Sequence, residues 1–131
     1  MNYEEFLLNI SRDNNFKIIG KRYNEESFGN FEIILLFANK IKIEINNDRG
    51  IIEINLNLHK ILSQISIPLC FVINSLNTSD YCQSSTFDSL EKVQELLFSS
   101  LPILTRIIEE NLTNEIIRKW KRRSNKQNRF C

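Results

Sequence analysis

The sequence predicts an α+β fold in which helices cover an antiparallel sheet of three to four strands. Three observations carry this prediction. Apolar and polar residues alternate through residues 41–56, which is the period of a half-buried strand. Apolar residues recur every three or four positions near both ends of the chain, as they do in amphipathic helices. Because the strands fall in the first half, the helices at either end must pack on one face of the sheet.

The N-terminal segment from Tyr3 to about Arg12 is expected to be a helix. Phe6, Leu7 and Ile10 share one face at helical spacing. Asn2 is a residue type that accepts a hydrogen bond from the free N–H groups of a first turn. The turn-forming residues 13–15 then end the helix.

The strands follow in order. Phe16–Tyr23 is β-prone, and Phe31–Phe37 is apolar almost throughout, which indicates a strand buried on both faces. The alternating segments Ile41–Asn46 and Ile52–Leu56 flank a turn that contains Gly50, and this pattern predicts a β-hairpin. The short break at residues 39–40 favours antiparallel pairing of the second and third strands, so the sheet is a meander.

The middle of the chain gives weaker signals. Leu58–Ile65 has apolar residues at helical spacing and is expected to form a short helix that Pro68 ends. Leu69–Ile73 fits either a fourth strand or a buried helical turn, and the pattern does not choose between them. Asn74–Ser85 is rich in small polar residues and is expected to be an exposed loop.

Helical spacing returns from about Asp88. Pro102 should break the segment near Ser100, so that a second helix runs from about Leu104 to Trp120. We expect one domain over residues 1–123 and a frayed basic tail over residues 124–131.

Charge is distributed unevenly along the chain. The formal net charge is +1, but residues 1–115 hold all 16 acidic side chains and ten basic ones, which gives −6. The last 16 residues hold seven basic side chains and no acidic one, which gives +7. An acidic body with a basic tail favours charged partners.

Composition also suggests a compartment. No basic and apolar leader opens the chain, and its apolar runs are shorter than the ~20 residues of a membrane helix. The three cysteines, Cys70, Cys82 and Cys131, are odd in number and widely spaced. We therefore expect free thiols, a cytoplasmic location and no membrane partner.

Catalytic and cofactor motifs are missing from the sequence. The single histidine, His59, has no evident nucleophile or orienting carboxylate near it in the sequence, and Cys-x-x-Cys, His-x-x-x-His and Gly-Lys-Ser/Thr do not occur. The sequence thus predicts a non-enzymatic protein without metal or cofactor. A dispersed site around His59 and a structural oligomer stay open as rival hypotheses.

The C-terminal basic segment supports a role in nucleic-acid binding. Its cations can neutralise phosphates, and an aromatic side chain among them can stack on a base. The candidate contacts are Arg118, Lys119, Trp120, Lys121, Arg122 and Arg123. Two other interpretations compete with nucleic-acid binding. The cations can serve only to stabilise the C-terminal end of a helix dipole, and Trp120 can belong to the apolar stripe that the helix buries.

Two short motifs suggest a family. Phe28-Gly29-Asn30 precedes the second strand and Asp48-Arg49-Gly50 forms the hairpin turn. With the N-terminal helix, they resemble small bacterial immunity proteins of polymorphic and contact-dependent toxin systems, over about residues 1–60 and more loosely in the C-terminal helices. The resemblance implies a small, cytoplasmic, non-catalytic protein that binds a cognate toxin domain, in many cases a nuclease, and occludes its active site. Asp48, Arg49 and Gly50 would then shape the turn without contacting the toxin.

The toxin contacts are expected in exposed acidic loops, since many such toxins carry basic clefts. The candidates are Glu25, Glu26, Asp80 and Tyr81. Binding to nucleic acid through the basic segment is the alternative function.

Overall fold

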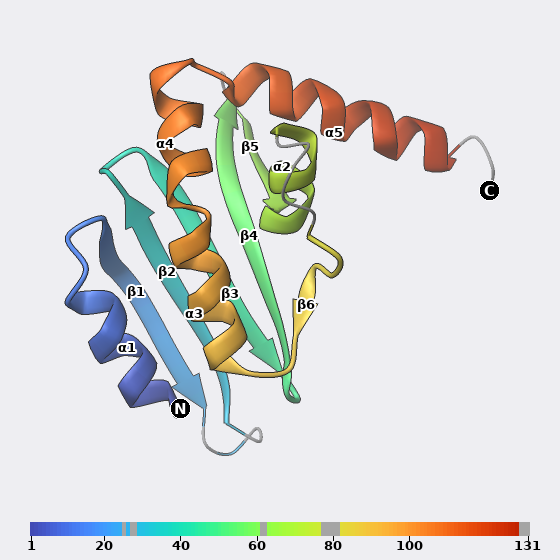
Figure 1. Cartoon of the computed structure of the whole chain (residues 1–131). Coiled ribbons are helices and arrows are strands. Elements are labelled where there is room, and N and C mark those ends of the chain that lie inside the picture. The colour runs from blue at the N-terminus through green and yellow to red at the C-terminus, as the bar shows by residue number, and fades with distance from the viewer. Residues whose placement is uncertain (25, 27–28, 61–62, 77–81, 129–131) are drawn as a thin grey trace.

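The structure, a computed structural model, describes residues 1–24, 26, 29–60, 63–76 and 82–128. Within them an antiparallel sheet runs in the order β1-β2-β3-β4-β5, and a short β6 pairs with β4 (Figure 1). The strands are β1 (Phe16–Asn24), β2 (Asn30–Phe37), β3 (Ile41–Asp48), β4 (Ile51–Lys60), β5 (Ser63–Pro68) and β6 (Thr86–Phe87). The predicted α+β class is confirmed, and the sheet is larger than the three to four strands expected.

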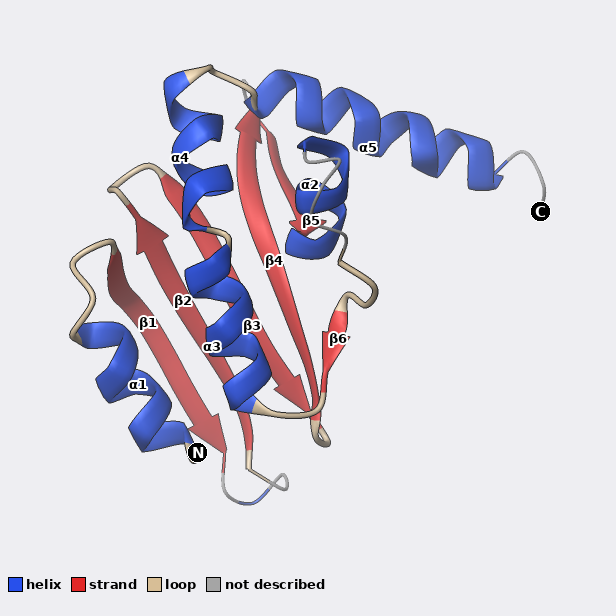
Figure 2. Cartoon of the chain, in the orientation of Figure 1, coloured by secondary structure: helices blue, strands red, loops and turns tan. Residues whose placement is uncertain are grey.

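Helices cover the sheet. α1, α3 and α4 lie across β1 to β4, whereas α2 and α5 pack near β4 and β5 (Figure 2). The helices are α1 (Tyr3–Ser11), α2 (Leu69–Leu76), α3 (Leu90–Ser99), α4 (Leu101–Glu109) and α5 (Thr113–Asn128). The later part of α5 extends away from the sheet (Figure 1). None of the described helices is long and apolar enough to cross a membrane.

One hydrophobic core joins the two layers. Alternate residues of β2 and β3 are buried, with Ile33, Leu35, Ile43 and Ile45 completely covered. Helical side chains such as Phe6 complete the same cluster. Burying this apolar surface supplies the main stabilisation of the fold.

The expected helix over Leu58–Ile65 is wrong. Leu58 lies in β4, Ile65 lies in β5, and the two residues pair across a hairpin. Each of the two strands has apolar residues at every second position, Leu56 and Leu58 in β4 and Ile65 and Ile67 in β5. Across the hairpin these two period-2 patterns together imitate the spacing of a helix.

The adjoining segment Leu69–Ile73, which fitted a strand or a helical turn, is helical and begins α2. The loop expected over Asn74–Ser85 includes the last three residues of α2, and residues 82–85 belong to no helix or strand.

The C-terminal helices break twice. Ser100 ends α3 and precedes α4, which has a proline in its first turn, as the sequence predicted. The sequence analysis missed a second break, between α4 and α5. Asn111 adopts a positive φ of 52° there, which ends α4 before α5 begins. α5 continues as a helix to Asn128, through most of the segment expected as a tail.

The cysteine prediction is also wrong for two residues. Cys70 and Cys82 form a disulfide, with their Cα atoms 5.3 Å apart. The side chain of Asn74 fixes the backbone beside it, since its Nδ2 donates to Cys82 O and its Oδ1 accepts from Cys82 N, each at 2.8 Å. A rule based on cysteine number could not reveal that α2 and the following segment bring these two residues together. Cys131 lies outside the described residues.

Candidate protein-binding surface

Several connections meet at one end of the sheet, which we call the loop end. It comprises the N-terminus, the connection from β1 to β2, the turn from β3 to β4, and the start of α3 (Figure 1). In this turn Arg49 has a φ of 55° and Gly50 a φ of 86°. Positive φ at both central residues is the pattern of a type I′ hairpin turn, as the sequence predicted for Gly50.

The two sequence motifs contact each other at the loop end. Asn30 Oδ1 accepts a hydrogen bond from the backbone N–H of Arg49 at 2.8 Å. Asn47 Nδ2 donates to Gly29 O at 3.3 Å, so the β1–β2 connection is fastened to the hairpin. Asn47 Oδ1 is buried and has no hydrogen-bond partner among the described residues. Arg49 Nε lies 3.8 Å from Asp48 Oδ1, and the two side chains form an exposed ion pair.

Exposed apolar side chains gather at this end. Ile51, the first residue of β4, is 56% exposed, and Tyr23, near the end of β1, is 47% exposed. The ring of Tyr23 packs on Tyr3, with 4.8 Å between the ring centroids, and Tyr3 packs on Phe31 at 5.2 Å. Burial, with a smaller effect of Glu4, raises the pKa of Tyr3.

Two hollows adjoin these side chains. One of about 370 Å³ is lined by Tyr3, Tyr23 and Asn47, among others. The second, of about 630 Å³, lies along Ile51 and β6. Gly50 and Asp88 line both hollows. The loop end therefore offers depressions as well as exposed apolar groups, a combination that suits the side chains of a partner.

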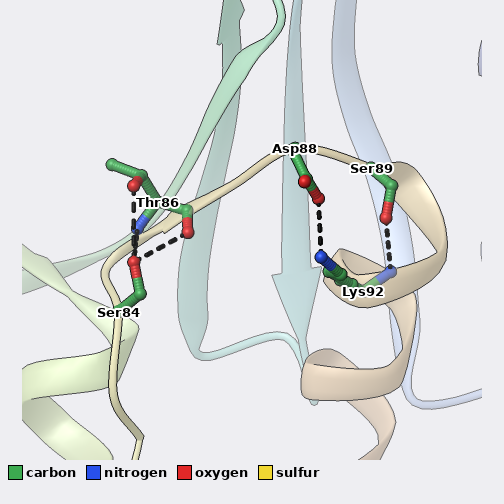
Figure 3. Close-up of polar contacts among 5 residues, drawn as sticks. All are labelled: Ser84, Thr86, Asp88, Ser89 and Lys92. Carbon is green, nitrogen blue, oxygen red and sulfur yellow. Dashed lines mark hydrogen bonds and ion pairs between the residues drawn. The ribbon is translucent and has the colours of Figure 1, made fainter.

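The wall of the larger hollow is held by local hydrogen bonds (Figure 3). Ser84 Oγ donates to Thr86 O at 2.9 Å and accepts from Thr86 N at 3.2 Å. Ser89 caps α3, since its Oγ accepts from Lys92 N at 3.3 Å. Asp88 and Lys92 form an ion pair at 2.8 Å, which lowers the pKa of Asp88 and raises that of Lys92.

Acidic groups outnumber basic ones at the loop end. Among the described residues, the basic groups there are Arg22, Arg49, Lys92 and the Met1 amino group, and each pairs with an acid. The Met1 amino group contacts Glu91, which raises the pKa of the amino group and lowers that of the carboxyl. The described acids are Glu4, Glu5, Glu26, Glu32, Asp48, Asp88 and Glu91.

The sequence located part of this surface. Of the predicted partner contacts, Glu26 lies at the loop end, exposed, and its backbone N–H donates to Asn24 Oδ1 at 3.1 Å. Glu25, Asp80 and Tyr81 lie outside the described residues. Sequence analysis missed Ile51 and Tyr23. The adjacent pair Ile51-Ile52 was a usable signal, because neighbouring residues in a strand point to opposite faces and Ile52 is buried.

The predicted nucleic-acid contacts separate on α5. Trp120 packs edge-on against Phe71 of α2, with 4.9 Å between the centroids. Lys119 donates to Ser75 O at 3.0 Å and pairs with Glu115 at 3.3 Å. Arg118, Lys121 and Arg122 are exposed, and helical geometry points them away from the side of α5 that bears Trp120. Arg123 is exposed and lies over Phe71 and Trp120.

His59 is exposed in β4, opposite Gln64 of β5. Within the part of the chain that the structure describes, no group of three or more His, Cys, Asp or Glu side chains is placed to hold a metal ion.

Comparison with protein-family models, curated proteins and solved structures finds no match to this chain. The candidate site therefore rests on the geometry of the loop end.

Proposed function

We propose that this chain is an immunity protein, which binds a cognate bacterial toxin domain through the loop end and neutralises it by occluding the active site. One observation carries the proposal. Exposed Ile51 lines one hollow and exposed Tyr23 lines the other, within a surplus of acidic side chains. Aromatic and aliphatic anchors set among charges are typical of protein interfaces.

The charge of the loop end suits a basic partner. An acidic surface attracts a cationic active-site cleft, as in a nuclease, and accelerates association. The hydrogen bonds of Asn30 and Asn47 hold the turn and the neighbouring connection in place before binding. A surface that is ordered in advance loses less conformational entropy when it binds.

The first test identifies the toxin and then measures the interaction with purified proteins. Affinity capture from nuclease-treated lysate should recover one stoichiometric toxin domain, whose expression arrests growth unless this chain is co-expressed. Recovery of nucleic acid alone from untreated lysate, lost after nuclease treatment, would contradict the proposal. So would a captured domain that is no less toxic in the presence of this chain.

The second test locates the contact. Ile51→Asp should weaken binding to the purified toxin domain at least tenfold, because it places a charge where an apolar anchor is buried. Leu8→Asp is the matched control, since Leu8 is 50% exposed on α1 and lies away from the hollows. Equal affinities for both variants would remove the loop end from the interface.

A second candidate function is nucleic-acid binding through α5. The exposed cations Arg118, Lys121 and Arg122 favour it. It predicts DNA or RNA binding that weakens steeply with salt and is lost when the three residues are changed to Gln. The packing of Trp120 against Phe71 gives less support, since the ring lies apart from these cations.

A cytoplasmic location is part of the immunity proposal. Disulfides are rare in the cytoplasm, so a cytoplasmic location does not predict the Cys70–Cys82 bond. Alkylation of thiols in intact cells before lysis measures which state the pair adopts in its own compartment.

A further inference from the structure

A third hollow lies between α2 and α5, and it shares Cys82 and Gln83 with the larger hollow of the loop end. It has a volume of about 590 Å³ and is lined by Phe71, Trp120 and Arg123 together with polar side chains such as Asn74 and Gln83. Among the described residues that line it, Arg123 is the only charged one. The hollow therefore combines an aromatic wall with one cation at its rim.

The walls of this hollow are fixed by contacts within the protein. α2 ends in carbonyl groups that cations satisfy, since Lys119 Nζ donates to Ser75 O at 3.0 Å and Arg106 Nη1 donates to Leu76 O at 2.8 Å. Asn74 holds the backbone of Cys82 through two hydrogen bonds, and the disulfide joins Cys82 to α2. The shape is therefore set before any ligand arrives, which lowers the entropic cost of binding.

The aromatic wall positions the cation. The Arg123 guanidinium carbon lies 5.5 Å from the centroid of the Phe71 ring and 5.9 Å from that of Trp120. Cation–π attraction to the two rings favours this position, and Arg123 is otherwise exposed. A guanidinium held in this way presents N–H donors that match the two oxygens of a carboxylate.

From these contacts we propose that the α2–α5 hollow is a second binding site, which takes an acidic peptide segment of a partner protein. A carboxylate of the segment pairs with Arg123, and a neighbouring apolar side chain rests against Phe71 and Trp120. Charge complementarity commits the site to this ligand. None of the described residues that line the hollow is acidic, and Arg118, Lys121 and Arg122 add positive potential on the same helix.

A peptide fits these features better than nucleic acid does. Binding of a single strand uses a row of cations along the backbone and open aromatic faces for the bases. Among the described residues, a single cation lines the hollow, so a row of cations is missing there. The other exposed cations of α5 point away from it.

The site can be tested without knowledge of the natural partner. A phage-displayed library of random dodecapeptides is selected against the immobilised full-length protein, and the enriched peptides are synthesised. Trp120 is the only tryptophan of the chain, so its fluorescence reports occupancy of this hollow directly. We expect enriched peptides with Asp or Glu next to an apolar residue, and a change in Trp120 emission when they bind.

Two comparisons then decide the role of Arg123. Arg123→Gln should weaken peptide binding at least tenfold, whereas Arg122→Gln, which removes the same charge one position away, should weaken it less than threefold. A peptide with its acids replaced by amides should bind wild-type protein at least tenfold more weakly, a result that depends on no variant folding.

Several results would overturn the proposal. The library could enrich no peptide, or only peptides without acids. Arg123→Gln and Arg122→Gln could weaken binding equally, which would reduce the effect to overall charge. Salt-sensitive binding of a 20-base-pair DNA that Arg123→Gln abolishes would assign the hollow to nucleic acid. These tests depend on Trp120 and Arg123, which line neither loop-end hollow, so a failure here leaves the predicted effect of Ile51→Asp unchanged.

Discussion

Asn30 accepts a hydrogen bond from the backbone N–H of Arg49, 19 residues further along the chain, with 2.8 Å between Asn30 Oδ1 and Arg49 N. This bond joins the start of β2 to the β3–β4 turn. It also explains why Gly29-Asn30 and Asp48-Arg49-Gly50 occur together in one sequence, since one motif satisfies a backbone donor of the other. Both motifs therefore have a structural role at the loop end.

The bond between Asn30 and Arg49 should be measurable in stability. Asn30→Ala removes the acceptor and should lower the free energy of unfolding by about 1 kcal/mol, the usual net value of one hydrogen bond. Urea denaturation followed by circular dichroism would measure it. Asn114→Ala on the exposed side of α5 should change stability by less than about 0.5 kcal/mol. If the two variants were equally stable, the turn would not depend on Asn30.

The β2–β3 turn offers a stabilising substitution. Ala38 has a φ of 50°, in the left-handed region that is unfavourable for a residue with a Cβ atom. Ala38→Gly should relieve this strain and raise the free energy of unfolding by about 0.5–1 kcal/mol, after allowance for the freer unfolded chain. Thermal unfolding would test it, and a lower melting temperature than wild type would contradict the prediction.

Sequence reasoning worked best where one local pattern determines the structure. The hairpin around Gly50 followed from strict alternation on both sides and a residue suited to positive φ. The break between α3 and α4 followed from Pro102, which cannot continue a helix in its interior. Each of these features depends on a few adjacent residues.

It failed where distant residues decide. Leu58 and Ile65 have helical spacing, yet Leu58 lies in β4 and Ile65 in β5. Pairing between strands of the sheet, and not the local spacing, determines their structure. The disulfide of Cys70 with Cys82 and the contact of Phe71 with Trp120 depend on how α2 packs after folding. The exposed side chain of Ile51 stands out as a candidate contact only because a hollow forms beside it.

The ion pair of Asp88 and Lys92 should be visible in a pH titration. The hydrogen bond and the charge of Lys92 lower the pKa of Asp88 below its ordinary value of 3.8. A depressed carboxyl pKa stabilises the folded protein above that ordinary value, and the stabilisation is lost as the pH falls through the lowered pKa. NMR titration of the Asp88 carboxyl should show this pKa returning toward 3.8 in Lys92→Gln. An identical pKa in wild type and variant would show that the pair does not form in solution.

The Cys70–Cys82 disulfide makes a prediction about both stability and thiol count. It spans 12 residues in sequence, and closing a loop of this size should stabilise the fold by about 2–3 kcal/mol. Cys82→Ser should therefore unfold at lower urea concentration and should not respond to reductant, whereas reductant should shift wild type to the variant's curve. Cys131→Ser, which leaves the pair intact, should keep the wild-type response. Titration of denatured, unreduced wild type should find one thiol per chain, and a count of three would show that the disulfide had not formed.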